Sequence, residues 1–207
     1  MNQSASRIFI VDDDDGLRAA LARLLRASGY NVESLSTPDD LLERADLTSQ
    51  PACVVLDLLM PGMTGLEVQQ KLAGLLPIVF LTGHGDVSSS VEAMKGGALD
   101  FLPKPVCEAR LLAAVERALN RACIESRRRN ERAEIEERMS HLTHREREVM
   151  DLVVNGRLNK QVASDLGASE KTIKIHRGRV MAKMKARTLV ELVRIVAKAR
   201  VCSTDEE

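Results

Sequence analysis

The sequence predicts an α/β fold, a (βα)5 doubly wound parallel sheet, followed by a helical linker and an all-α helix-turn-helix region. Three observations support this prediction. Over the first 120 residues, short apolar runs alternate with amphipathic helical patterns. Residues 120–140 are rich in Arg and Glu and contain neither Gly nor Pro, as a continuous helix requires. Beyond residue 141 the apolar periodicity is entirely helical.

The predicted strands are short apolar runs that cover residues 7–11, 31–35, 52–56, 78–82 and 100–102. Helical segments separate or follow them, and Thr37, which precedes Pro38, and Thr64 are typical N-cap residues. Because parallel strands need helical crossovers, we expect helices on both faces of the sheet.

The charged segment of residues 120–140 would span about 30 Å as a helix. The alternative is a disordered charged tether. We therefore predict an N-terminal domain of residues 1–121, a linker of residues 122–140 and a C-terminal domain of residues 141–207.

Four helices are predicted in the C-terminal domain. Thr143 and Glu146 form a capping box for the first helix. The second covers residues 159–166 and stops at Gly167, and the third begins after Ser169 and runs to about residue 184. The fourth carries an apolar stripe made of Leu189, Leu192, Val193 and Val196.

Charge divides the chain into an acidic and a basic half, although 30 basic and 30 acidic side chains cancel overall. Residues 1–120 hold 10 Lys and Arg against 16 Asp and Glu, whereas residues 121–207 hold 20 against 14. Within residues 141–200 the net charge is +8, which suits a nucleic-acid partner.

The cysteines are widely spaced, without a Cys-x-x-Cys pair that would indicate a zinc site. No apolar run reaches the roughly 18 residues of a membrane span, and the N-terminus does not resemble a secretory signal. We expect a cytoplasmic protein without a membrane partner.

Carboxylates follow two of the predicted strands. Asp57 follows the apolar run 52–56, and Asp12 and Asp13 follow strand 7–11. In a parallel sheet these C-terminal ends meet at the edge where open α/β sheets bind ligands. Two like charges ~4 Å apart repel by ~4 kcal/mol at an effective dielectric of 20, so the cluster needs a cation or a raised pKa. Oxygen ligands with open positions suit Mg²⁺.

Two more strands bring a hydroxyl and an ammonium group to the same edge. Thr82 ends strand 78–82, and Lys104 follows strand 100–102. Together with the carboxylates they meet the needs of phosphoryl transfer, namely a nucleophile, charge neutralisation and donors for the oxygens. Each of these residues alone is more often an ordinary turn or surface group, so the hypothesis depends on their joint occurrence at successive strand ends.

Over residues 7 to about 121 the sequence resembles the receiver domain of bacterial two-component response regulators. The motifs that carry the resemblance are Asp12-Asp13, Asp57, Thr82 and Lys104-Pro105. The resemblance implies the strand order 2-1-3-4-5, a cis bond between Lys104 and Pro105, and transfer of a phosphoryl group to Asp57 from a sensor histidine kinase.

The same resemblance implies roles for the surrounding residues. Mg²⁺ would be held by Asp13, Asp57 and the main-chain carbonyl of Leu59, with support from Asp12. Thr82 and Lys104 would bind the phosphoryl oxygens, and Phe101 would change rotamer. Leu59 is apolar and cannot orient a hydrolytic water, so we expect slow loss of the phosphoryl group unless His84 takes that role.

Residues 159–166, the turn 167–169 and the basic segment 170–183 predict a helix-turn-helix, whose second helix enters the major groove of DNA. Its expected inward stripe is Ile173, Val180 and Met184. The cations left outward are Lys171, Lys174, Arg177 and Arg179. The alternative for this basic face is a solvated helix surface.

Residues 141–200 resemble the LuxR-type DNA-binding domain of the NarL and FixJ branch of response regulators. The supporting motifs are Leu142-Thr143-x-Arg145-Glu146-x-Glu148-Val149, Asn159-Lys160-x-Val162-Ala163 and Thr172-Ile173-Lys174-Ile175-His176. The resemblance implies that the fourth helix pairs two subunits. It implies groove contacts by Lys174, Ile175 and Arg177 and backbone contacts by Lys160, Thr172 and Lys183.

Two residues of the basic helix need separate interpretation. Gly178 departs from relatives that carry a basic side chain there, which puts base readout at that position in doubt. A mid-helix Gly also costs ~1 kcal/mol relative to Ala. We expect His176 to be a packed core residue with its hydrogen bonds satisfied.

The sequence therefore predicts a transcription regulator that is phosphorylated on Asp57, dimerises and binds double-stranded promoter DNA, with RNA polymerase as a further candidate partner. A haloacid-dehalogenase-like phosphatase is one alternative, but it would carry a second Asp two residues after the first, where this chain has Leu59. The other is a phosphate-independent DNA binder with a vestigial pocket, which would not need the full set of pocket residues.

Overall fold

The computed structural model describes residues 6–83 and 87–200, without the side chains of residues 87–89. His84 and Cys202 therefore lie outside the described residues. The chain forms two compact units, residues 1–127 and residues 128–207.

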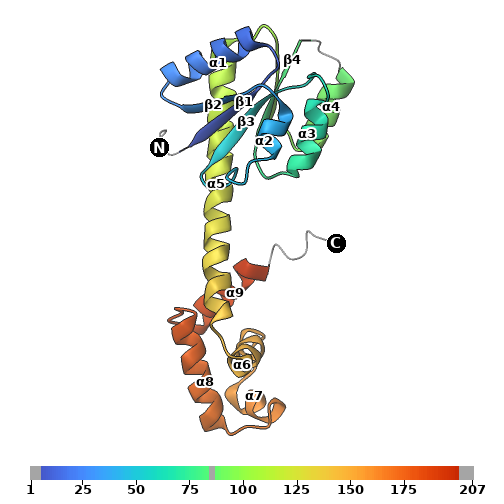
Figure 1. Ribbon diagram of the computed structural model, residues 1–207. Coiled ribbons are helices and arrows are strands. Elements are labelled where there is room, and N and C mark those ends of the chain that lie inside the picture. The colour runs from blue at the N-terminus through green and yellow to red at the C-terminus, as the bar shows by residue number, and fades with distance from the viewer. Residues whose placement is uncertain (1–5, 84–86, 201–207) are drawn as a thin grey trace. The chain divides into compact units, whose positions relative to one another are not determined.

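The first unit contains a five-stranded sheet with the order β2-β1-β3-β4-β5, in which every pairing is parallel (Figure 1). The strands are β1 (Arg7–Val11), β2 (Asn31–Leu35), β3 (Ala52–Asp57), β4 (Ile78–Thr82) and β5 (Asp100–Pro103). The predicted fold class is confirmed, with β3 and β5 each one residue longer than expected. Every residue of β3 and β4 is buried, because both faces of the sheet are covered.

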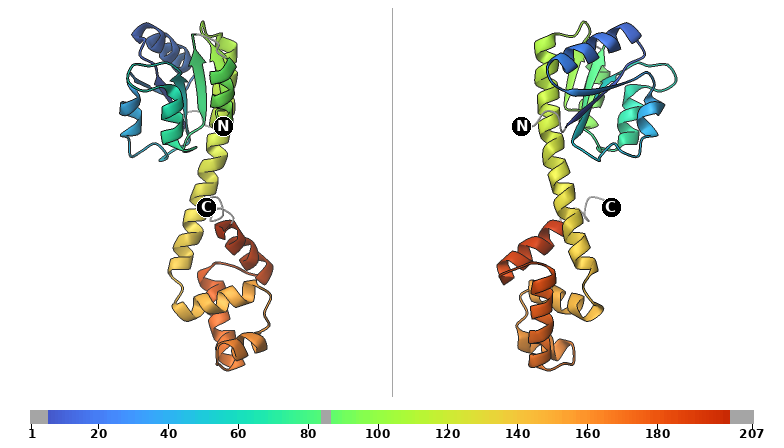
Figure 2. Two further views of the ribbon diagram at one scale, coloured as in Figure 1. Left: turned by 90° about the vertical axis from the view of Figure 1, so that its right-hand side faces the viewer. Right: turned by 60° about the vertical axis from the view of Figure 1, so that its left-hand side comes forward.

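Helices cover both faces of this sheet (Figure 2). On one face, α1 (Asp15–Ala27) and the first part of α5 (Glu108–Ser140) pack against the strands through residues such as Leu25 and Leu111. On the other lie α2 (Pro38–Leu42), α3 (Gly65–Leu72) and α4 (Val87–Lys95). The covered sheet leaves its C-terminal edge as the place for a site.

The predicted helix starts are confirmed. The hydroxyl of Thr37 accepts a hydrogen bond from the main-chain N–H of Asp40 at 3.3 Å, with Pro38 in the first turn. Thr64 and Glu67 form a capping box, in which each side chain accepts a bond from the other residue's main-chain N–H. These caps set the direction in which α2 and α3 leave the sheet.

The second unit is built from α6 (His144–Val154), α7 (Asn159–Asp165), α8 (Glu170–Lys183) and α9 (Leu189–Arg200). Thr143 and Glu146 form the predicted capping box of α6, and Ser169 caps α8. The predicted inward stripe of α8 is buried, with Ile173, Val180 and Met184 each at most 1% exposed. On α9, Leu192 and Val196 are buried but Val193 is 38% exposed, so the predicted stripe is narrower than expected.

The last turns of α5 also belong to the core of this unit. Ile135 is 3% exposed, and Met139 packs against the same cluster as Val149 and Leu192. Both lie within residues 122–140, the segment predicted as linker, and that segment is helical throughout its length.

None of the described helices combines the length and the apolar character that crossing a membrane would require.

Candidate functional site

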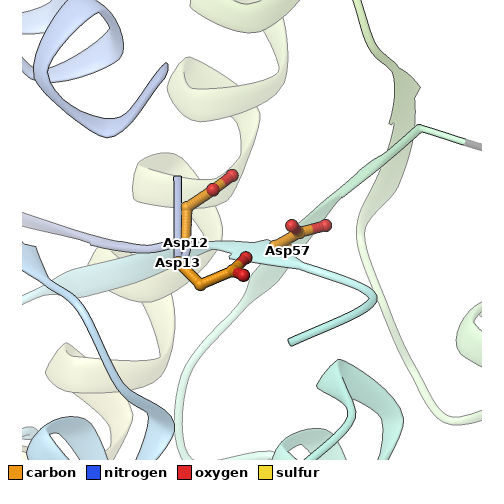
Figure 3. Close-up of side chains that lie close together, drawn as sticks. All are labelled: Asp12, Asp13 and Asp57. Carbon is orange, nitrogen blue, oxygen red and sulfur yellow. The ribbon is translucent and has the colours of Figure 1, made fainter. Parts of the chain in front are cut away.

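Three carboxylates gather at the C-terminal edge of the sheet. Asp12 and Asp13 follow β1, and Asp57 is the last residue of β3 (Figure 3). Each offers a carboxylate oxygen, and these oxygens lie within 4.8 Å of one another. Asp12 is 0% exposed and Asp57 is 6% exposed, whereas Asp13 is open to solvent. The structure thus brings together Asp12, Asp13 and Asp57, which the sequence predicted at one edge of the sheet.

A single ammonium group bridges two of these acids. The Nζ atom of Lys104 lies 2.8 Å from Oδ2 of Asp12 and 2.8 Å from Oδ2 of Asp57. Burial opposes the charged form of Lys104, but its hydrogen bonds to Asp12 and Asp57 outweigh that effect and raise its pKa above the usual value. The cation therefore stays charged and partly offsets the repulsion between the two buried carboxylates.

The backbone holds Lys104 in place beside β4. Its main-chain N–H donates to the carbonyl of Thr82 at 2.6 Å. The bond between Lys104 and Pro105 is cis, as the resemblance implied. Thr82, the last residue of β4, is 1% exposed. A hydroxyl at the end of β4 and an ammonium group directly after β5 thus lie at the same edge of the sheet.

The loop after β1 is fixed by its own carboxylates. Oδ1 of Asp12 accepts a hydrogen bond from the main-chain N–H of Asp14 at 2.9 Å. Asp14 caps α1 by accepting bonds from the main-chain N–H groups of Leu17 and Gly16, which lower its pKa. Asp13 is the middle residue of the turn that the Asp12 carboxylate closes, directly before the cap of α1.

The first residue of α3 packs closely against the main chain of Asp57. A Cβ atom at Gly65 would lie 2.4 Å from the main-chain oxygen of Asp57, so only glycine fits there. Leu59 is 59% exposed, and its main-chain N–H lies 3.4 Å from Oδ1 of Asp57. An apolar side chain therefore stands at the solvent side of the pocket.

Phe101 of β5 is half-buried at the edge of the second core cluster. Its ring centroid lies 6.2 Å from that of Phe80, with the rings tilted by 47°. Its main-chain N–H donates to Oδ1 of Asp100 at 2.8 Å. A half-buried ring in this position can pack inward or turn towards solvent.

The chemistry of the acid cluster fits a hard divalent cation. All ligand atoms are oxygens, which Mg²⁺ prefers, and the exposed side of Asp13 leaves room for the waters that Mg²⁺ usually retains. The residues that would hold it are Asp13 and Asp57, with Asp12 beside them.

The helix-turn-helix presents most of its predicted cations to solvent. Lys171, Lys174 and Arg179 of α8 are exposed, as are Lys160 and Thr172, and Ile175 is 50% exposed. The turn contains Gly167 at φ +60°, a conformation that favours glycine. Arg177 is half-buried, and its Nη1 atom donates to Oδ1 of Asn159 at 3.0 Å.

Lys183 has a structural role that the sequence analysis missed. Its Nζ atom lies 2.6 Å from Oε2 of Glu146 and 3.0 Å from the carbonyl of His141. Glu146 is 2% exposed, and the bonds from Lys183 and from the main-chain N–H of Thr143 lower its pKa to about 2. This pair joins the end of α8 to the start of α6, and no local sequence signal indicates it.

The expectation that His176 is a packed core residue with satisfied hydrogen bonds differs from the structure. The residue is half-buried, but its Nδ1 atom is buried without a hydrogen-bond partner. A residue type and its place on a helix do not show whether a hydrogen-bond partner lies within reach.

Two family models match separate parts of the chain. Residues 8–116 match the family model described as response regulator receiver domain, and residues 140–196 match the model for bacterial regulatory proteins of the luxR family.

Full-length relatives resemble the whole chain. The transcriptional regulatory protein FixJ of Azorhizobium caulinodans is 41% identical, over 96% of this chain and 95% of that protein. Nodulation protein W of Bradyrhizobium diazoefficiens is 44% identical, over 91% of this chain and 84% of that protein. The solved structure of the response regulator StyR is 41% identical and matches with a TM-score of 0.81, covering 94% of this chain and all of that one.

Proposed function

Because the chain belongs to the NarL/FixJ family of two-component response regulators, we propose that Asp57 accepts a phosphoryl group and that this transfer controls DNA binding by α8. The protein is a transcription regulator in which a receiver with an acidic site precedes a LuxR-type DNA-binding region. Its family consists of regulators, not enzymes, which excludes the phosphatase alternative. A receiver implies a histidine kinase as donor, and the LuxR-type region implies DNA as ligand.

The single observation that carries the proposal is the arrangement around Asp57. A carboxylate oxygen of Asp57 would attack the phosphorus of a phosphohistidine; the new O–P bond forms as the P–N bond breaks, and the departing imidazole takes up a proton. The proposed Mg²⁺ supplies positive charge to the phosphoryl oxygens when it is bound. Lys104, already 2.8 Å from Asp57, would stabilise the same oxygens with Thr82.

The proposed switch uses the edge of β4 and β5. A phosphoryl group on Asp57 would draw Thr82 towards it and open space for the half-buried ring of Phe101 to turn inward. We propose that this change alters the surface around α4 and β5 and favours a homodimer. Exposed apolar side chains on α4 (Val91 and Met94) and on α9 (Val190 and Val193) suit association between copies.

Dimerisation would supply the DNA affinity that one helix-turn-helix does not provide. Non-specific binding of a single module has a dissociation constant of ~10⁻⁴ to 10⁻⁶ M. In a dimer the second module binds its half-site within the same complex, so the overall affinity for DNA is higher than that of either module alone. We propose groove contacts by Lys174, Ile175 and Arg177 and backbone contacts by Lys160 and Thr172. We also propose a DNA-backbone contact by Lys183, whose ammonium group donates to Glu146 and to the His141 carbonyl and has a third N–H that can reach a phosphate.

We also propose how the chain is divided into domains and where it acts. We retain residues 1–121 as receiver, 122–140 as linker and 141–207 as DNA-binding domain, with the addition that Ile135 and Met139 complete the core of the last. We propose a cytoplasmic location, because a histidine kinase donor, promoter DNA and RNA polymerase would all be met there.

Labelling by acetyl phosphate tests the phosphoacceptor. With Mg²⁺ present, the wild-type chain should gain one phosphoryl group, and Asp57→Asn should gain none. Asp39→Asn, an exposed acid in the first turn of α2, is the matched control and should label like the wild type. Equal labelling of Asp57→Asn and the wild type would refute Asp57 as the acceptor, and no labelling of either would refute it in favour of a vestigial pocket.

A further inference from the structure

Arg18 of α1 reaches back to the loop that carries the acid cluster. Its Nη1 atom donates to the main-chain carbonyl of Asp12 at 2.7 Å, and its Nη2 atom pairs with the carboxylate of Asp15. The Arg18 side chain is only 15% exposed, whereas that of Asp15 is 89% exposed. Because exposed ion pairs contribute little, the bond to the Asp12 carbonyl is the one with structural weight.

This bond completes the fixation of the loop. The carboxylate of Asp12 already holds the main-chain N–H of Asp14, and Asp14 caps α1. Arg18 adds a bond to the main-chain carbonyl of Asp12, in the peptide unit that joins Asp12 to Asp13. The peptide unit before Asp13 is therefore anchored to α1, and with it the direction in which the Asp13 carboxylate leaves the chain.

Charge and geometry predict opposite effects of Arg18 on a metal at this site. As a cation beside the acid cluster, it lowers the local negative potential, so its removal alone should strengthen binding of a divalent cation. As an anchor of the loop, it holds Asp13 near Asp57, so its removal should weaken binding. The bond to the carbonyl and the burial of the guanidinium favour the second effect.

We propose that Arg18 is a positioning residue for Mg²⁺: by anchoring the Asp12 carbonyl, it holds Asp13 in the geometry that the cation needs, and this outweighs its repulsion of the cation. The inference rests on the metal site proposed above. The guanidinium of Arg18 is bonded to the Asp12 carbonyl and the Asp15 carboxylate, so Arg18 would act on the metal through Asp13 and not by direct contact.

Calorimetric titration of the full chain with Mg²⁺ provides the test. Arg18→Ala should bind Mg²⁺ about 10- to 100-fold more weakly than the wild type, the range for residues that orient metal ligands. Arg18→Lys keeps the charge and can donate to one acceptor, so its affinity should lie between the two. Arg23→Ala, which removes an exposed arginine from the same helix, is the control and should bind like the wild type.

The possible results distinguish the role of Arg18 from the existence of the metal site. Unchanged or tighter Mg²⁺ binding by folded Arg18→Ala would overturn the positioning role while leaving the metal site intact. A lower melting temperature with normal Mg²⁺ affinity would reduce Arg18 to a structural residue and would also overturn it. Absence of Mg²⁺ binding by the wild-type chain would overturn the metal site itself, and this inference with it.

Discussion

The two units of the chain place their charged side chains in opposite ways. In the receiver unit, Asp12 and Asp57 are buried and share the ammonium group of Lys104. In the helical unit, cations of α8 such as Lys171, Lys174 and Arg179 are exposed. Charges in a buried pocket interact strongly with one small ligand, whereas an exposed face attracts a polyanion over a longer range.

This difference shows which interactions depend on exact geometry. A buried carboxylate without its partner is costly, so the pocket must keep a cation or bind one. A solvated lysine costs nothing when DNA is absent and can adjust to a phosphate when DNA is present. The exception in the helical unit is the buried Glu146, which is paired with Lys183 as tightly as the pocket acids are paired with Lys104.

Lys104→Met should have the largest effect on stability. The variant leaves Asp12 and Asp57 without their shared cation, which by analogy with buried pairs costs about 3–5 kcal/mol. Mg²⁺ should restore much of this loss, because it supplies the missing positive charge. Lys95→Met, at an exposed position of α4, is the control. Urea melts with and without Mg²⁺ measure the effect, and equal stability of Lys104→Met and the wild type in EDTA would contradict it.

Ile135→Ala tests whether the end of α5 belongs to the helical unit. Truncating this buried side chain should destabilise the unit by about 2–5 kcal/mol. Ile124→Ala, on the same helix but 53% exposed, should change stability by no more than about 0.5 kcal/mol. Hydrogen exchange of α6 to α9 in the full chain gives the measurement. Similar exchange in the two variants would show that the unit begins after α5.

Glu146→Gln should remove a pH-dependent contribution of about 1–3 kcal/mol. The pKa of Glu146 is lowered from 4.5 to about 2, chiefly by Lys183. The stabilisation is therefore complete above about pH 4.5 and is lost as the pH falls towards 2. Thermal melts from pH 7 to pH 3 should show the variant and the wild type converging, whereas a constant difference would contradict the assignment. Glu137→Gln, an exposed acid of α5, should show no such trend.

Leu59→Asn should have the smallest effect and should shorten the lifetime of the phosphoryl group. An amide at this exposed position can orient a water towards the phosphorus, and one hydrogen bond of about 1 kcal/mol corresponds to roughly five-fold faster loss. Decay of the acetyl phosphate label measures the rate. Leu75→Asn, 45% exposed and located before β4, at the opposite edge of the sheet from the pocket, should leave it unchanged. Unaltered decay in Leu59→Asn would show that this position does not limit hydrolysis.

The sequence predicted the elements well, because their signals are local. Strands such as β3 are continuous apolar runs since both faces are buried, and Thr64 and Thr143 cap helices through bonds to residues three positions later. Asp12 and Asp57 could be placed together because strand ends in a parallel sheet share one edge.

Contacts between distant side chains could not be predicted in the same way. Lys183 reaches Glu146 across 37 positions of sequence. The Cζ atoms of Arg7 and Arg44 lie over the Phe9 ring, 5.5 and 5.4 Å from its centroid. Such pairs depend on the angle at which helices and strands meet, which composition and periodicity do not determine. The role of Arg18 was missed because its partner is a main-chain carbonyl, which no residue type identifies.

The central claim is that phosphorylation of the buried acid governs DNA binding by the exposed face, and size and gel-shift measurements with beryllofluoride test it most directly. The DNA is a duplex selected from random sequences by the wild-type chain. The wild type should become dimeric and bind this duplex more tightly when beryllofluoride and Mg²⁺ are added, whereas Asp57→Asn should respond in neither measurement. A dimer and DNA affinity that are the same with and without beryllofluoride, or that persist in Asp57→Asn, would contradict it.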